Sequence, residues 1–230
     1  MYFRHKPPLS VIDRYREGQC HLTFSYEYDL IGATRDEPYP AAYDGAHYRT
    51  FLGVGQDTFD AAKSALKAWR QFPDDVAEVW PRSTPIKEGT TAAVLLKALG
   101  LWKLAACRIV YTVDEPVGEP NRDDRPATTR FGVAYGSLPG HVERGEERFL
   151  VEWNREDDTV WYDLKAFSRP ATLLTWLGMP VARYYQRRFA RRSARSMQLA
   201  VDELKNAARE LHHSASRPVT RDHEAGESNR

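Results

Sequence analysis

The chain has 230 residues, of which 42% are hydrophobic and 12% aromatic, so it can bury a sizeable core. Its 33 basic and 32 acidic residues give a net charge near +1, which removes whole-chain electrostatics as an argument for nucleic-acid binding. Only two cysteines, no signal-peptide core and no apolar run of about twenty residues together favour a cytoplasmic protein without a transmembrane segment.

The first part of the chain predicts an extension, two strands and a helix. Residues 1–19 are polar and mixed, and we expect an N-terminal extension there. Apolar and polar residues alternate over 22–28 and again over 48–52, which predicts two half-buried strands. Asp57 then predicts the N-cap of a helix of about thirteen residues. Its apolar stripe consists of Phe59, Ala62, Leu66 and Trp69.

The central part of the chain has a hydrophobic period of two, which is typical of strands. The predicted strands are 76–80, 91–97, 104–114, 128–136, 148–153 and 159–167. Turn residues lie between them at 85–89, 115–126, 138–145 and 154–158. These signals predict sequential hairpins and therefore an antiparallel meander.

The last part of the chain returns to a helical period. Pro170 is predicted to open a short helix, which ends at Gly178 as Pro180 starts a longer one. The apolar stripe of this helix is Ala194, Met197, Val201, Leu204, Ala208 and Leu211. Residues 213–230 have almost no large apolar side chains and are expected to be a disordered tail. Residues 20–212 are then expected to form a single domain.

The order of these elements resembles the helix-grip fold of the START-like and Bet v 1-like superfamily. In this α+β fold a curved antiparallel sheet wraps around a long C-terminal helix and leaves a cavity. The resemblance implies a small apolar or amphipathic ligand between the sheet and that helix. Gly132, Ala134 and Gly136 leave one face of a predicted strand without large side chains. Such a face could make room for a ligand or permit close packing of a helix.

The segment Tyr135–Glu147, YGSLPGHVERGEE, combines a turn with the ionisable side chains of His141, Glu143, Arg144 and Glu146. Turn chemistry explains Pro139, Gly140 and Gly145, but it does not require a histidine, two acids and an arginine at one corner. Because the loop joins two strands of the sheet, we expect it at the rim of the cavity. The candidate ligand-binding residues are Tyr135, His141, Glu143, Arg144, Glu146 and Arg169.

Three interpretations of this group remain open. An Arg–Glu pair could pin the hairpin while His141 donates to a backbone carbonyl. Alternatively, Arg144 could bind a carboxylate or phosphate of a ligand. In the third interpretation, His141 with Glu143 or Glu146 performs the acid–base chemistry of a cyclase- or dehydratase-like enzyme.

Several segments resemble the bacterial and plant family called domain of unknown function nineteen-ninety. They are Tyr135–Glu147, Gly32–Arg35, Phe167–Pro170 and Gln186–Arg192. The resemblance spans most of the chain. It implies no catalytic residue, because the family's name records no activity.

Neither a metal site nor a cofactor is predicted. His141 and Glu143 have the H-x-E spelling of zinc deaminases but lack the cysteine motif that supplies the thiolates. The sequence contains no HExxH motif and no complete phosphate-binding glycine loop. Ligand identity and oligomeric state are not predicted by any of these patterns.

Six arginines between Arg183 and Arg195 crowd about three turns of the last helix. Arg183, Arg187, Arg191 and Arg195 fall on one stripe at steps of four. Because the whole chain is nearly neutral, we interpret the stripe as solvated or paired with the protein's own carboxylates, and nucleic acid is not expected as a partner. The alternative is phosphate, from nucleic acid or from an anionic lipid surface.

Overall fold

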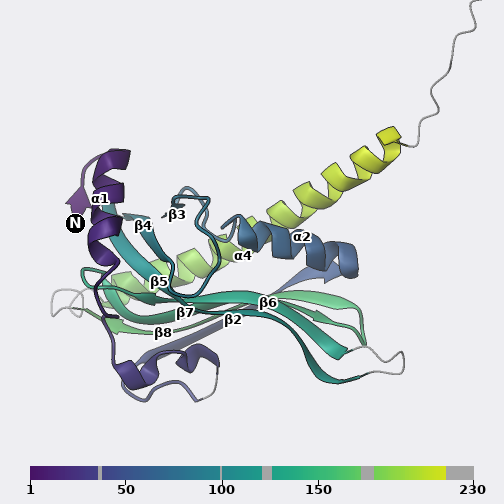
Figure 1. Ribbon diagram of the computed structural model, residues 1–230, viewed down its shortest axis with the longest axis horizontal. Helices are drawn as coiled ribbons and strands as arrows, with labels where there is room; N and C mark the ends of the chain where they lie inside the picture. The colour runs from purple at the N-terminus through teal and green to yellow at the C-terminus, as the bar shows by residue number, and fades with distance from the viewer. Residues whose placement is uncertain (36–37, 99, 121–125, 172–178, 216–230) are drawn as a thin grey trace, which may run out of the picture.

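The computed structural model describes residues 1–35, 38–98, 100–120, 126–171 and 179–215 (Figure 1). The strands are β1 (Tyr2–Phe3), β2 (Asp44–Val54), β3 (Ala77–Trp80), β4 (Thr91–Ala98), β5 (Leu101–Pro120), β6 (Pro126–Ser137), β7 (Glu143–Asn154) and β8 (Thr159–Pro170). The α-helices are α1 (Leu9–Gln19), α2 (Gln56–Lys67) and α4 (Met179–Ala215). Two short 3-10 helices are η1 (Tyr28–Leu30) and η2 (Ala33–Arg35).

All eight strands belong to one curved sheet, in the order β2-β8-β7-β6-β5-β4-β3, with β1 added to β5. Every pair from β3 to β8 is antiparallel and joins strands that are consecutive in the chain. The predicted meander is therefore confirmed. β2 closes the other edge by pairing with β8, from Asp44 opposite Ser168 to Val54 opposite Thr159.

The helices α2 and α4 lie on one face of the sheet and contact each other (Figure 1). α4 starts at Met179, so the predicted start near Pro180 is confirmed. Its side chains Met197 and Val201 are fully buried. Leu204 is only partly buried, because the C-terminal part of α4 runs beyond the sheet. The molecule is an α+β helix-grip fold.

The main core fills the space between the sheet and these two helices. The stripe predicted for α2 is buried in full, from Phe59 to Trp69. Phe72 follows and stacks on Phe149 of β7, with the ring centroids 5.5 Å apart. The predicted N-cap was wrong by two residues, since α2 begins at Gln56 and its cap is Gly55, at a φ of 85° that favours glycine.

Residues 22–28 do not form the predicted strand. They run across the face of the sheet that α2 and α4 do not cover, and the Ser25 amide donates to the Ser137 carbonyl over 2.9 Å. Gly136 permits this approach, because a Cβ there would lie 2.4 Å from the Tyr26 hydroxyl. At Gly136, the small-residue face of β6 therefore accommodates this segment.

Two further predictions concern the ends of the chain. Residues 9–19 form α1, which the sequence did not predict, and its Ile12 packs fully buried on Leu95 of β4 and Leu104 of β5. Pro170 is the last residue of β8, so it does not open the short helix that was predicted there, and residues 172–178 are outside the described residues. Most of the expected tail, residues 216–230, is outside them as well, whereas residues 213–215 belong to α4.

Candidate functional site

Strand β7 presents different chemistry on its two faces, because successive side chains of a strand point in opposite directions. Glu147 shares its face with Phe149 and Val151, which belong to the core under α2 and α4. Glu146 and Arg148 point to the opposite face, toward the segment that contains η2. We call the first the helix face and the second the outer face.

On the helix face, the hydroxyl of Tyr135 donates to Glu147 Oε2 over 2.5 Å. Aromatic rings surround the pair, with Phe149 at 5.6 Å and Phe72 at 6.1 Å from Tyr135, centroid to centroid. Burial raises the pKa of Glu147 to about 7, and the hydrogen bond from Tyr135 opposes that shift. Nearby Glu143 adds to the increase. The carboxyl of Glu147 therefore titrates near neutral pH.

Glu143 begins β7 on the same face and meets α4. Its Oε1 accepts from Gln186 Nε2 over 2.7 Å, and the same amide lies 3.1 Å from Ser168 Oγ of β8. Burial raises the pKa of Glu143, against the effect of the hydrogen bonds from Gln186 and Ser168. This corner of the helix face thus contains two carboxyl groups whose pKa values are raised by burial.

His141 lies in the turn before β7. Its Nδ1 is 3.2 Å from the Glu143 amide nitrogen and 3.0 Å from the Glu143 carbonyl oxygen. Burial lowers the pKa of His141 to about 4, although the backbone contact at Glu143 raises it. The ring is therefore neutral at pH 7. Within the described residues, the ring forms hydrogen bonds with the backbone of Glu143. It forms none with the carboxylate of Glu143 or Glu146.

Glu146 is on the outer face and 2% exposed. It accepts hydrogen bonds from the Tyr26 hydroxyl at 2.9 Å, the Gly32 amide at 2.8 Å and the Thr34 amide at 3.1 Å. The Thr34 hydroxyl donates to it as well. These contacts explain why the Gly32–Arg35 and Tyr135–Glu147 motifs occur together: η2 is fixed to β7 by this carboxylate.

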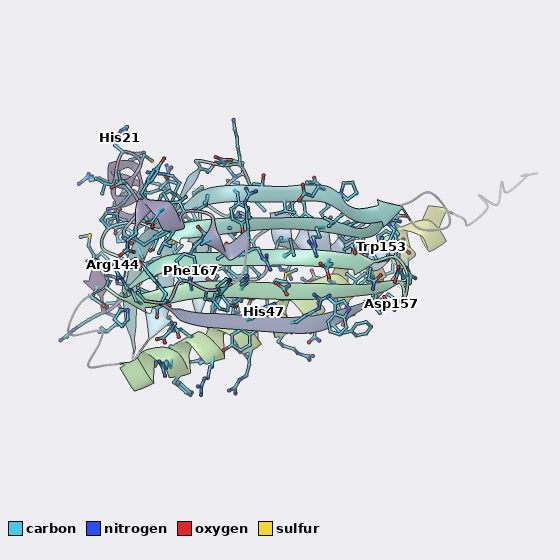
Figure 2. The ribbon with its side chains drawn as sticks, turned by 90° about the horizontal axis from the view of Figure 1, so that it is seen from below. His21, His47, Arg144, Trp153, Asp157 and Phe167 are labelled. Atoms are coloured by element: carbon cyan, nitrogen blue, oxygen red, sulfur yellow. The ribbon has the colours of Figure 1, made fainter. Side chains whose placement is uncertain are left out.

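The two candidate arginines also lie away from the helix-face carboxyls. Arg144 is exposed at the end of the sheet opposite to Trp153 and Asp157 (Figure 2). Arg169, near the end of β8, forms an ion pair with Glu27 and stacks on the Tyr43 ring, 4.8 Å from its centroid. The structure thus brings together Tyr135, Glu143 and the His141 ring, and it separates Arg144, Glu146 and Arg169 from them.

Sequence reasoning missed Glu147, Ser168 and Gln186. A signal for Glu147 was present. It lies at every second position together with Phe149, Val151 and Trp153, so it is on the same face of the strand as these core residues. Ser168 and Gln186 lie in two of the segments that resemble the family, but only the packing of α4 on β8 brings them to Glu143.

Among the described residues, no three His, Cys, Asp or Glu side chains are grouped in a way that could hold a metal ion. Within the same part of the chain, no helix has the length and apolar character needed to cross a bilayer.

Most of the chain matches a known protein family. The model of the family described as "Domain of unknown function (DUF1990)" matches residues 27–196, which include both motifs joined by Glu146. The chain belongs to the DUF1990 family. The match ends at residue 196, so the C-terminal part of α4 lies beyond the segment that the family shares.

Relatives of this DUF1990 protein occur in distant organisms. A UPF0548 protein of Dictyostelium discoideum is 35% identical over 220 residues, covering 90% of this chain and 98% of the relative. A UPF0548 protein of Arabidopsis thaliana is 34% identical, covering 66% and 70%. Among solved structures, human STARD10 is similar with a TM-score of 0.41 and 9% identity, covering 93% of this chain and 90% of that one.

Proposed function

We propose that this DUF1990 protein binds a small amphipathic molecule between the sheet and α4. The polar end of the ligand meets Glu147 and Glu143, and its apolar body lies on the aromatic side chains beside them. The observation that carries the proposal is the carboxyl of Glu147. It is half-buried on an aromatic surface, and Tyr135 is its hydrogen-bond partner on the sheet.

The charges of this corner restrict the head group of the ligand. Neither Glu143 nor Glu147 forms an ion pair within the part of the chain that the structure describes. A ligand that donates hydrogen bonds, as a hydroxyl or an ammonium group does, complements two carboxyls. A carboxylate ligand would place its negative charge beside these two carboxyls in surroundings of low dielectric constant, where it is repelled by either of them that is ionised.

The apolar side of the ligand is accommodated by a group of aromatic rings. Phe72, Phe149 and Phe189 lie within 6.4 Å of one another, measured between centroids. Tyr135 and Phe189 are partly buried, so they keep surface that a ligand could cover. Apolar walls with a few polar groups at one point are the usual composition of a small-molecule site.

The test compares three probes with one apolar body: 1-naphthylmethanol, 1-naphthylmethylamine and 1-naphthoate. Binding is measured by the change in naphthyl fluorescence at pH 7. The alcohol and the amine are expected to bind, and the carboxylate at least about tenfold more weakly because of the added repulsion. Glu147→Gln should remove most of this discrimination. Glu156→Gln is the matched control, since Glu156 is an exposed acid in the turn after β7.

Two results would contradict the proposal. One is equal affinity for the three probes in the native protein. The other is unchanged discrimination in Glu147→Gln, which would place the naphthyl group elsewhere. Native mass spectrometry of the purified protein then identifies any retained ligand, whose head group should be a donor.

Acid–base catalysis is the second candidate function, and the same carboxyl favours it. A group with a pKa near 7 is matched to proton transfer at neutral pH. The reacting pair would be Glu147 with Tyr135, because the His141 ring contacts backbone. Incubation of a retained ligand in D₂O with the native protein should then exchange a carbon-bound proton, and Glu147→Gln should not. If neither protein exchanges the proton, catalysis is contradicted and ligand binding is the one remaining proposal.

A further inference from the structure

The first half of α4 carries an unusual concentration of positive charge. Residues 183–195 include six arginines, and no acid occurs in the helix before Asp202. Cations are disfavoured toward the N-terminus of a helix by its dipole, and like charges four residues apart repel each other. This part of α4 therefore has an electrostatic cost that a negative partner would relieve.

Carboxylates of the protein form ion pairs with only three of these six arginines among the described residues. Arg183 pairs with Asp44 of β2 at 3.0 Å. Arg192 and Arg188 approach Asp75, at 2.5 and 3.9 Å. The other three are exposed and form no hydrogen bond or ion pair with any residue that the structure describes; they are Arg187, Arg191 and Arg195.

These three arginines lie beside the open edge of the sheet. α4 follows β2, from the pair of Arg183 with Asp44 to the bond that Gln198 donates to the Phe51 carbonyl over 3.3 Å. Fifteen residues of helix and seven of strand both span roughly 22 Å, so the two elements stay adjacent over this distance. The arginine row is thus held on a rigid support.

Exposed apolar side chains flank the row. On α4, Tyr184 is 61% and Leu199 51% exposed. At 100° per residue, both lie with the three arginines in an arc of about 120°. The surface therefore combines cations with apolar groups that water does not favour.

We propose that this surface docks on an anionic lipid membrane. We call it the arginine face and define it by Arg187, Arg191, Arg195, Tyr184 and Leu199. Arginines meet lipid phosphates and carboxylates while tyrosine and leucine enter the interfacial layer, as in other peripheral helices. A nucleic-acid backbone offers phosphates as well, but no apolar layer for Tyr184 or Leu199. This activity is separate from ligand binding on the helix face.

The experiment is co-sedimentation with two kinds of vesicle, phosphatidylcholine alone and phosphatidylcholine with about 30% phosphatidylserine, at about 0.1 M salt. The native protein should sediment with the second kind only. The triple variant Arg187→Gln, Arg191→Gln, Arg195→Gln should bind roughly a hundredfold more weakly, since each basic residue near an anionic surface contributes a factor of about five.

A matched control removes the same charge elsewhere. Arg4, Arg14 and Lys87 are exposed and have no side-chain contact within the described residues, and their triple Gln variant should sediment like the native protein. Leu199→Ser should weaken binding without changing its dependence on salt. A fluorescent DNA duplex serves as the second ligand in the same series.

Three outcomes would overturn the proposal. The native protein could fail to bind phosphatidylserine vesicles. The control triple variant could lose binding as much as the arginine triple. Finally, the DNA duplex could bind in an arginine-dependent manner while vesicles do not, which would assign the arginine face to nucleic acid.

Discussion

Glu146 and Glu147 are neighbours in the chain, yet they lie in opposite chemical surroundings. Glu146 on the outer face accepts hydrogen bonds from Tyr26, Thr34 and the Gly32 amide. Glu147 on the helix face is bonded to Tyr135, and burial raises its pKa to about 7. Burial of a carboxylate costs free energy unless hydrogen-bond donors surround it. Glu146 therefore has the donors that a buried carboxylate needs, whereas Glu147 is bonded only to the Tyr135 hydroxyl among the described residues.

The largest effect is expected from Glu146→Ala. The substitution leaves the buried donors of Tyr26, Gly32 and Thr34 without an acceptor, which should lower the free energy of unfolding by roughly 3–5 kcal/mol. Urea unfolding at pH 7 measures it. Glu156→Ala, at an exposed position, should change it by less than about 0.5 kcal/mol. If both variants unfold alike, Glu146 does not anchor η2.

Glu147→Gln should act in the opposite direction. A carboxyl whose pKa is raised by folding stabilises the protein below the unfolded pKa of 4.5, and this contribution is lost as the pH rises through about 7. The neutral amide avoids this loss, so the variant should be more stable than the native protein at pH 8, by up to roughly 3 kcal/mol. Thermal unfolding between pH 5 and 8 measures the difference. A less stable variant at pH 8 would contradict the assignment.

His141→Ala should have a smaller effect at neutral pH. Loss of the hydrogen bond between the ring and Glu143 should lower the free energy of unfolding by about 1 kcal/mol. In the native protein His141 stabilises above its unfolded pKa of 6.5, and this contribution is lost as the pH falls toward about 4. The free energy of unfolding of His141→Ala should therefore lack this decrease between pH 6.5 and about 4. Because Glu147 titrates in an overlapping range with opposite sign, the comparison is made in the Glu147→Gln background.

Arg144→Ala should change least. Arg144 is exposed, so the free energy of unfolding should stay within about 0.5 kcal/mol and the naphthyl probes should bind with unchanged affinity. Isothermal titration with 1-naphthylmethylamine tests the second part. A loss of affinity in Arg144→Ala with unchanged stability would instead support the sequence-based interpretation that this arginine contacts the ligand.

Much of the fold could be predicted because periodicity reports which side chains are buried. The alternation of Val160, Tyr162 and Leu164 and the helical spacing of Met197 and Val201 placed β8 and α4 correctly. Residues 22–28 alternate as well, but Phe24 and Tyr26 pack on Gly136 of β6, and the segment does not pair as a strand. α1 was missed because one apolar residue, Ile12, accounts for most of its burial.

The candidate site was predicted less completely than the fold. Tyr135 and Glu143 were proposed from the motif, and both lie beside Glu147 on the helix face. Glu146 shares the motif but lies on the other side of the strand. A shift of one residue reverses the face of every side chain, so motif membership alone does not predict which carboxyl meets a ligand.

The proposal that Glu147 binds a ligand head group is tested most directly by the titration of its carboxyl carbon, followed by ¹³C NMR in the native protein. We expect a pKa of about 7 in the free protein. We expect a marked decrease in this pKa when 1-naphthylmethylamine saturates the site, because an ammonium group favours the carboxylate. A value near the ordinary 4.5 in the free protein, or one that the amine leaves unchanged, would contradict the proposal.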